Sequence, residues 1–190
     1  MTVERIRDAI QESIDAKAAL TEEDHRVILE IAYTMVEALS QGNKVIWMGN
    51  GGSAADAQHL AAELVSRFYK ERDGLPSLAL NTNTSVITAI GNDYGFNRVF
   101  ERQLEALARP GDVVVGISTS GNSPNVLLAI EKARDMGCLT IGLTGASGGQ
   151  LAGIVDLCLR APSDDTPRIQ EVHITVGHVI CEIVESIMFG

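Results

Sequence analysis

A loop of short hydroxyl side chains, residues 118–123, is the first stretch of the chain that could do chemistry. It follows the apolar run 113–117, which predicts a buried strand, and it ends where Pro124 opens a helical pattern. Its hydroxyl donors are Ser118, Thr119, Ser120 and Ser123. A helix N-terminus presents free backbone N–H groups and a positive dipole end, so this loop favours a bound phosphate or another small anion. The alternative is an ordinary N-cap by Ser123, which leaves three further hydroxyls unexplained.

A second candidate is a pair of ionisable side chains, His59 and Glu63, in an alanine-rich helical pattern. Their spacing of four places both on one helix face, where they can share an ion or a substrate; a solvated helix face is the alternative.

In the last apolar segment, Gln170, His173 and His178 are polar interruptions. His173 lies about 140° from His178 around a helix, so the two should not meet on one ligand. Gln170 is about 80° from His178 and roughly 12 Å along the axis, so these two converge only by reaching toward each other.

Alternating strand and helix patterns position these residues. Two amphipathic helical patterns, 3–19 and 22–39, precede the first strand. Expected strands are 44–48, 77–80, 113–117, 139–144 and, at an edge, 157–160. Expected helices are 53–69, 84–90, 97–108, 124–136, a weak one at 150–154, and 168–188. This order predicts an α/β fold: a three-layer sandwich in which helices cover both faces of a mostly parallel central sheet.

The loops that follow three of the expected strands should meet at one edge of the sheet. They are 50–53, 81–85 and 118–123, and ligands of such sheets bind beyond the carboxyl ends of the strands. No linker or repeat divides the chain. We therefore expect one domain over residues 1–190, with a helical segment at 1–41 and an α/β core at 44–190.

Composition limits the partners. The chain has 15 Lys and Arg against 25 Asp and Glu, a formal charge of −10, which would repel nucleic acid and anionic membranes. No uninterrupted apolar run approaches the roughly 18 residues of a membrane span, and the amino terminus lacks signal-peptide character. We expect a cytoplasmic protein that binds neither nucleic acid nor membrane.

Four motifs together resemble the phosphoheptose isomerases, a family of the sugar isomerase (SIS) fold. They are GNGGSAADAQH at 49–59, AIGNDYGF at 89–96, GISTSGNS at 116–123 and RIQEVH at 168–173. The resemblance implies a homotetramer with sites near subunit interfaces. It also implies conversion of sedoheptulose 7-phosphate to D-glycero-D-manno-heptose 7-phosphate, the first step toward activated heptose for envelope polysaccharide.

The same resemblance implies roles for single residues. Glu63 and His178 match the family's acid–base pair. One zinc ion per subunit is implied, with ligands His59, Glu63, Gln170 and His178. Positions that match substrate contacts are Asn50, Gly51, Gly52, Ser53, Glu63, Arg67, Asn92, Asp93 and Gln170, with Ser118, Thr119, Ser120 and Ser123 holding the phosphate. Since Glu63 is named both as a ligand and as a base, either it shifts during turnover or the ion occupies a resting arrangement.

Other functions of the same fold compete with this reading. One is a non-catalytic interaction protein of the replication-initiator-associating type, which resembles these isomerases along its length. Others are an isomerase or a sensor of another phosphosugar. A carboxylate and an imidazole beside a phosphate loop favour an enzyme.

Overall fold

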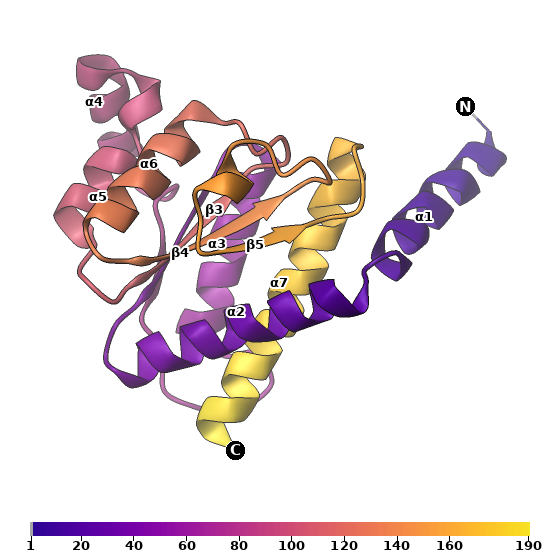
Figure 1. Ribbon diagram of the computed structural model, residues 1–190, viewed down its shortest axis with the longest axis horizontal. Coiled ribbons are helices and arrows are strands. Elements are labelled where there is room, and N and C mark those ends of the chain that lie inside the picture. The colour runs from indigo at the N-terminus through magenta and orange to yellow at the C-terminus, as the bar shows by residue number, and fades with distance from the viewer. Residues whose placement is uncertain (1) are drawn as a thin grey trace.

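Five parallel strands form the centre of the molecule in a computed structural model that describes residues 2–190. In chain order they are β1 (Val45–Gly49), β2 (Ser77–Ala79), β3 (Val113–Ile117), β4 (Leu139–Thr144) and β5 (Leu157–Arg160). The sheet order is β2-β1-β3-β4-β5, and every pairing is parallel (Figure 1). Since β1 and β3 are buried along their whole length, the continuous apolar runs predicted them correctly.

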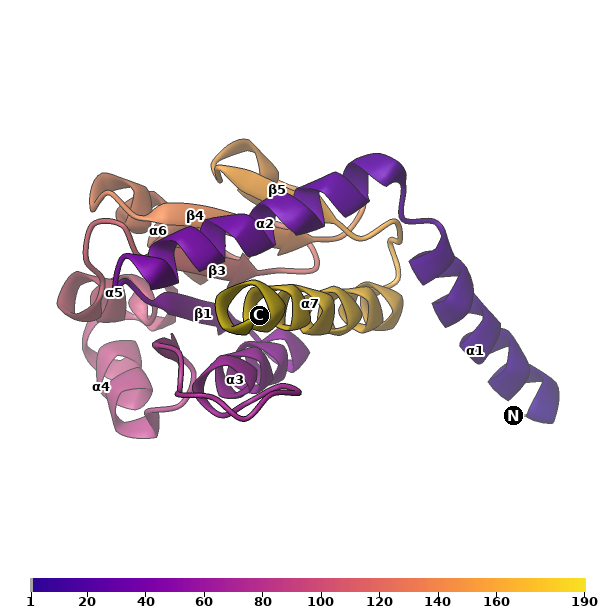
Figure 2. The same cartoon turned by 90° about the horizontal axis from the view of Figure 1, so that it is seen from below.

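Helices cover both faces of the sheet, which confirms the predicted three-layer α/β sandwich. One face carries α2 (Glu22–Ser40), α3 (Gly52–Val65) and α7 (Thr166–Phe189), which pack on each other and on the strands (Figure 2). The other carries α4 (Thr84–Tyr94), α5 (Glu101–Leu107) and α6 (Pro124–Asp135), with the short turns η1 (Phe96–Arg98) and η2 (Leu151–Gly153). Two apolar cores therefore lie on either side of one sheet.

The first helix, α1 (Val3–Ala18), extends away from the body of the molecule (Figures 1 and 2). Of its residues, only Ala16 is buried. An apolar row, Val3, Ile6, Ile10 and Ile14, is more than half exposed at every position. By contrast, α2 begins with a capping box, in which the Thr21 and Asp24 side chains each bond the other's backbone N–H.

Three helices depart from their predicted bounds by more than two residues. α3 ends at Val65 rather than at residue 69, because the chain leaves the helical conformation at Ser66. α4 continues past its predicted end at residue 90 to Tyr94, and Gly91 lies in open space within it. The helix predicted over 97–108 is divided into η1 and α5.

α7 is long and apolar enough to cross a membrane by length and composition. Polar residues interrupt every apolar run of α7, so no uninterrupted run marks it, yet they are too few to lower its mean hydropathy below that of a membrane span. Here the helix belongs to the core: Val172, Val176, Ile180 and Val184 are buried against α2 and α3. The buried row explains the apolar composition without a membrane.

Candidate active site

Three of the predicted site residues come together between α3 and α7. The Nε2 atoms of His59 and His178 are 2.8 Å apart, and His59 Nε2 lies 3.2 Å from Glu63 Oε1. One ligand atom from each residue lies within 4.8 Å of the others. Residues 119 positions apart in sequence thus form one cluster of two imidazoles and a carboxylate, and the His59–Glu63 pair is more than a solvated helix face.

Close packing of α3 on α7 makes this cluster possible. A Cβ atom on Gly177 would stand 2.6 Å from the terminal methyl groups of the buried Leu60, so glycine lets the two helices approach without displacing that side chain. Gly177 directly precedes His178 in sequence, and Leu60 directly follows His59. The helix axes therefore come close where His59 and His178 must meet.

The chemistry of this donor set suits zinc. Two imidazole nitrogens and one carboxylate oxygen are ligands that zinc accepts, and three protein ligands leave a position for water or substrate. The imidazole nitrogens and the carboxylate already converge, partly open to solvent, with 49% of the His59 side chain and 22% of Glu63 exposed. The fourth predicted ligand, Gln170, lies against Gly52: its Nε2 is 2.5 Å from where a Cβ on that glycine would stand.

The hydroxyl loop lies between the end of β3 and the start of α6. Ser123 occupies the N-cap position of α6, but its side chain does not cap the helix; it bonds Ser118 Oγ at 2.9 Å. The ordinary-cap alternative is therefore wrong for the side chain. Ser120 is exposed, and its Oγ accepts the backbone N–H of Asn122.

A polar depression of about 290 Å³ opens beside this loop. Thr119 and Ser120 of the loop line it, together with Ser147 and Thr166. Gly121 has φ 64°, and a Cβ there would stand 2.1 Å from the carbonyl oxygen of Gly148. The loop and the chain after β4 thus pack backbone to backbone and fix the shape of the depression.

The turn after β1 is tied to the start of α6. Asn50 and Asn125 exchange two amide hydrogen bonds, of 2.8 and 2.9 Å. Gly51 has φ 57°, and Ser53, in the first turn of α3, is buried. The predicted sugar-contacting turn and the phosphate loop are therefore held by one amide pair.

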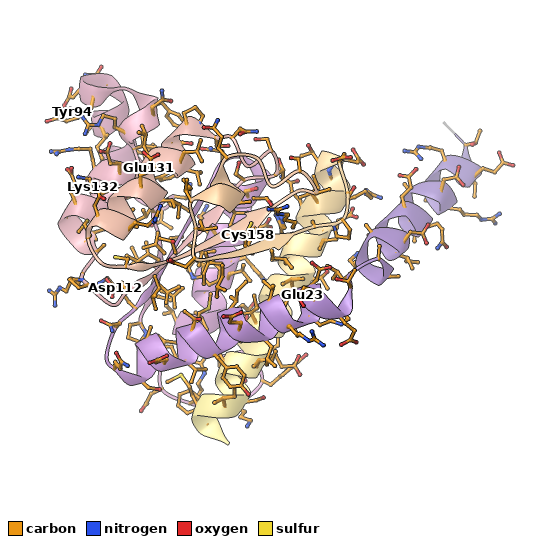
Figure 3. The ribbon with its side chains drawn as sticks, in the orientation of Figure 1. Glu23, Tyr94, Asp112, Glu131, Lys132 and Cys158 are labelled. Carbon is orange, nitrogen blue, oxygen red and sulfur yellow. The ribbon has the colours of Figure 1, made fainter. Side chains whose placement is uncertain are left out.

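Three other predicted substrate residues are not joined to the cluster by any observed contact. Arg67 is exposed and pairs with Glu71 at 3.5 Å. Asn92 and Asp93 are exposed and bond each other at 2.8 Å. They belong to α4, on the opposite face of the sheet from α3 and α7; the neighbouring Tyr94 marks the outer corner of the molecule in Figure 3.

His173 points away from the cluster, as the helical angle predicted. It is fully buried, and its Nε2 bonds the carbonyl oxygen of Thr144 at 2.9 Å. Its Nδ1 has no hydrogen-bond partner among residues 2–190. Burial lowers the pKa of His173 to about 4, against the smaller opposing effect of the Thr144 bond, so the ring is neutral. It fixes α7 on β4.

Several residues near the cluster were missed from sequence. Asp56 lies one turn before His59 on α3; burial raises its pKa, nearby His59 opposes the rise, and its Oδ2 lacks a partner within residues 2–190. The Phe68 ring lies 5.9 Å from the His178 ring. Arg72 and Glu185 form a buried ion pair nearby, at 2.9 Å. The i, i+3 spacing of Asp56 and His59 was the one local signal available.

Comparison with known proteins identifies the class to which this fold and site belong. The model of the SIS domain matches residues 9–145. The chain therefore belongs to the SIS-domain family.

Within that family its relatives are phosphoheptose isomerases. The phosphoheptose isomerase of Roseiflexus sp. (strain RS-1) is 59% identical over 96% of this chain and 92% of the relative. That of Aquifex aeolicus (strain VF5) is 53% identical over 98% of this chain and 97% of the relative. The resemblance predicted from the four motifs is confirmed, and the chain groups with the phosphoheptose isomerases.

Solved structures agree. Phosphoheptose isomerase GmhA from Neisseria gonorrhoeae matches with a TM-score of 0.91 at 44% identity, over 96% of this chain and 98% of that one. A phosphoheptose isomerase from Francisella tularensis matches with a TM-score of 0.94 at 39% identity, over 98% of this chain and 100% of that one. These matches favour an aldose–ketose isomerase over an interaction protein of the same fold.

Proposed function

We propose that this protein converts sedoheptulose 7-phosphate to D-glycero-D-manno-heptose 7-phosphate, the first step toward activated heptose. The carrying observation is the convergence of Glu63 and His178, from two helices, around His59. A carboxylate and an imidazole within 4.8 Å of each other, in a chain that also carries a hydroxyl loop at the end of β3, are what a phosphosugar isomerase requires. The phosphoheptose isomerases that match almost the whole chain support this substrate.

The reaction moves one proton between carbons and another between oxygens. A proton leaves C1 of the ketose and arrives at C2, while the carbonyl moves from C2 to C1 through a cis-enediol. The carbon acid is weak, so the base must be held against it. We assign the carbon-bound proton to the Glu63 carboxylate. His178 suits transfer between the two oxygens, because an imidazole both donates and accepts protons near neutral pH.

The remaining polar residues hold the substrate in place. Ser118, Thr119, Ser120 and Ser123 are the proposed phosphate site, supported by the depression beside the loop. Asn50, Gly51, Gly52 and Ser53 form the proposed sugar-binding turn, together with Gln170, which lies against Gly52. With the phosphate fixed, C1 and C2 have few positions available relative to Glu63.

We also propose one zinc ion per subunit, bound by His59, Glu63, Gln170 and His178. The three converging donors support this ligand set. When bound, zinc polarises the substrate oxygens and lessens the charge that develops on them. His59 would then act only as a metal ligand. Glu63 and His178 would act both as metal ligands and in the proton transfers.

Assembly into a homotetramer completes the proposal. The exposed apolar row of α1 has no cover within residues 2–190, which supports burial against other copies. Asn92 and Asp93, far from the cluster of their own chain, would then contribute to a neighbouring subunit's site; Arg67 is exposed at the end of α3.

We treat residues 1–190 as a single SIS domain. The charge of −10 supports a cytoplasmic enzyme without nucleic-acid or membrane partners.

Incubation of the purified protein with sedoheptulose 7-phosphate tests the activity. Aldose should form. In deuterium oxide, C2 of the product should carry deuterium if the proton held by Glu63 exchanges with solvent before it is returned to the substrate. Glu63→Gln protein is the matched control. Absence of aldose with this substrate, together with turnover of another ketose phosphate, would redirect the assignment to that sugar.

A further inference from the structure

The end of α3, two residues after Glu63, is closed by a side chain from outside the helix. The last carbonyl groups of a helix lack intrahelical partners. Arg72, whose side chain is 1% exposed, donates to the carbonyl oxygens of Glu63 at 3.0 Å and Leu64 at 2.9 Å. It also donates to that of Ser66 at 3.0 Å, where the helical conformation stops. The backbone of Glu63 is therefore bonded directly to a buried guanidinium.

The guanidinium is anchored to α7 by a buried carboxylate. Glu185, 2% exposed, accepts Arg72 Nε–H at 2.9 Å. It also accepts the backbone N–H groups of Phe68, Tyr69 and Lys70, at 2.6 to 2.9 Å. Burial acts to raise the pKa of Glu185, but these donors outweigh it and lower the pKa to about 2. The carboxylate stays charged throughout the range in which the enzyme would work.

The two anchors lead to the two proposed acid–base residues. Glu185 lies seven residues after His178, so it occupies nearly the same face of α7, two turns further along. The loop that Glu185 holds includes Phe68, whose ring lies 5.9 Å from the His178 ring. One ion pair thus connects the backbone of Glu63 with the helix and the aromatic neighbour of His178.

Stability alone is a weak reason for such a pair. Removing two charges from water costs several kcal/mol, and well-packed apolar side chains of similar size often stabilise a fold as much or more. What apolar side chains cannot supply is a set of directed bonds to the carbonyls of one helix end and the N–H groups of one loop.

We propose that Arg72 and Glu185 are positioning residues that set the distance between Glu63 and His178. The inference rests on the proposed roles of those two residues. A shift of about 1 Å in a catalytic group can lower turnover as much as roughly 100-fold. Loss of the pair should therefore lower kcat while KM, which depends on the distant hydroxyl loop, changes little.

Arg72→Lys and Glu185→Gln are the test variants, because each keeps the approximate size of the side chain. Lysine keeps the charge but cannot reach Glu185 and the helix-end carbonyls together. We expect kcat for sedoheptulose 7-phosphate to fall about 10- to 100-fold in each, with KM within about twofold, when folded protein is compared. A lowered melting temperature with wild-type kcat would overturn the proposal and leave the pair a stabilising contact.

A matched control exists in a second buried ion pair, just before β3, whose residues are not part of the cluster. Asp112 (Figure 3) is 1% exposed, pairs with Lys44 at 2.5 Å and accepts the backbone N–H groups of Lys44 and Arg109. Asp112→Asn removes a buried charged carboxylate of the same kind, at the amino ends of the strands. It should lower stability and leave kcat unchanged. A kcat loss in Asp112→Asn equal to that in Glu185→Gln would mean that instability, not position, explains both.

A double variant separates this inference from the proposed function. If Arg72 acts through Glu63, Arg72→Lys should lower kcat little further in a Glu63→Gln background. If the kcat of the double variant falls by the product of the two single-variant losses, Arg72 does not act through Glu63. Wild-type turnover by Glu63→Gln alone would instead remove the acid–base assignment, whichever result Arg72→Lys gives in the wild-type background.

Discussion

Single side chains of the cluster between α3 and α7 carry the proposed chemistry. Glu63→Gln keeps the shape and removes the base, so kcat should fall by roughly 100-fold or more with the fold intact. His178→Ala should also be severe. The double variant should lose much less than the product of the two, because residues that act as a unit are not additive. Steady-state kinetics measure these losses, with circular dichroism as a folding control. Near-normal turnover in folded Glu63→Gln protein would contradict the acid–base assignment.

The hydroxyl loop should govern binding rather than turnover. Ser120 is exposed beside the polar depression, so its hydroxyl is free to reach a phosphate oxygen that is bound equally in the ground and transition states. Ser120→Ala should then mainly raise KM, since uniform binding is lost. Unchanged kinetics would restrict this hydroxyl to its bond with the Asn122 backbone.

Metal content tests the proposed zinc ligands. Protein purified without chelator should contain about one zinc per chain, and His59→Ala should lose it, because one of the converging nitrogens is gone. Elemental analysis gives the stoichiometry. Zinc retained in full by the variant would exclude His59 from the ligand set.

At the scale of helices and strands, His173 makes the attachment of α7 to β4 sensitive to pH. Its pKa is about 4 in the fold and about 6.5 in an unfolded chain, so the unfolded state takes up the proton first as the pH falls. The contribution is complete above pH 6.5 and is lost between there and pH 4, by up to about 3 kcal/mol. Urea unfolding at fixed protein concentration measures it. In His173→Gln, which keeps a donor for Thr144, that part of the pH slope should disappear; an unaltered slope would assign it to other groups.

Elements defined by local patterns were predictable, and those ended by distant contacts were not. Each strand appeared as a short apolar run, and the parallel α/β order followed from alternation. The end of α3 did not, because residues 66–69 contain no glycine or proline; the helix stops where Arg72 takes its carbonyls, held by a carboxylate 113 positions further on. Likewise, spacing predicted that His59 and Glu63 share a face. That His178 would join them came from resemblance alone.

For the whole molecule, the exposed row on α1 makes assembly the expected state. Light scattering at micromolar concentration should give four times the chain mass. Ile10→Asp places a charge in the middle of the row, and a smaller species should result, because a buried unpaired charge is costly. A monomer from the unmodified protein would contradict the proposed tetramer. A tetramer unaffected by Ile10→Asp would place the contacts on other surfaces.

The order of the elements along the chain has a consequence for biosynthesis. α7 fills the core between α2 and α3 and carries both His178 and Glu185, yet it follows every strand of the sheet. While the ribosome is still making α7, all five strands have been synthesised. The apolar surface that α7 covers on the sheet, α2 and α3 is then exposed. Such a nascent chain exposes apolar surface to other proteins, which makes it a candidate for chaperone binding. The cluster of His59, Glu63 and His178 can form only after the last helix has emerged.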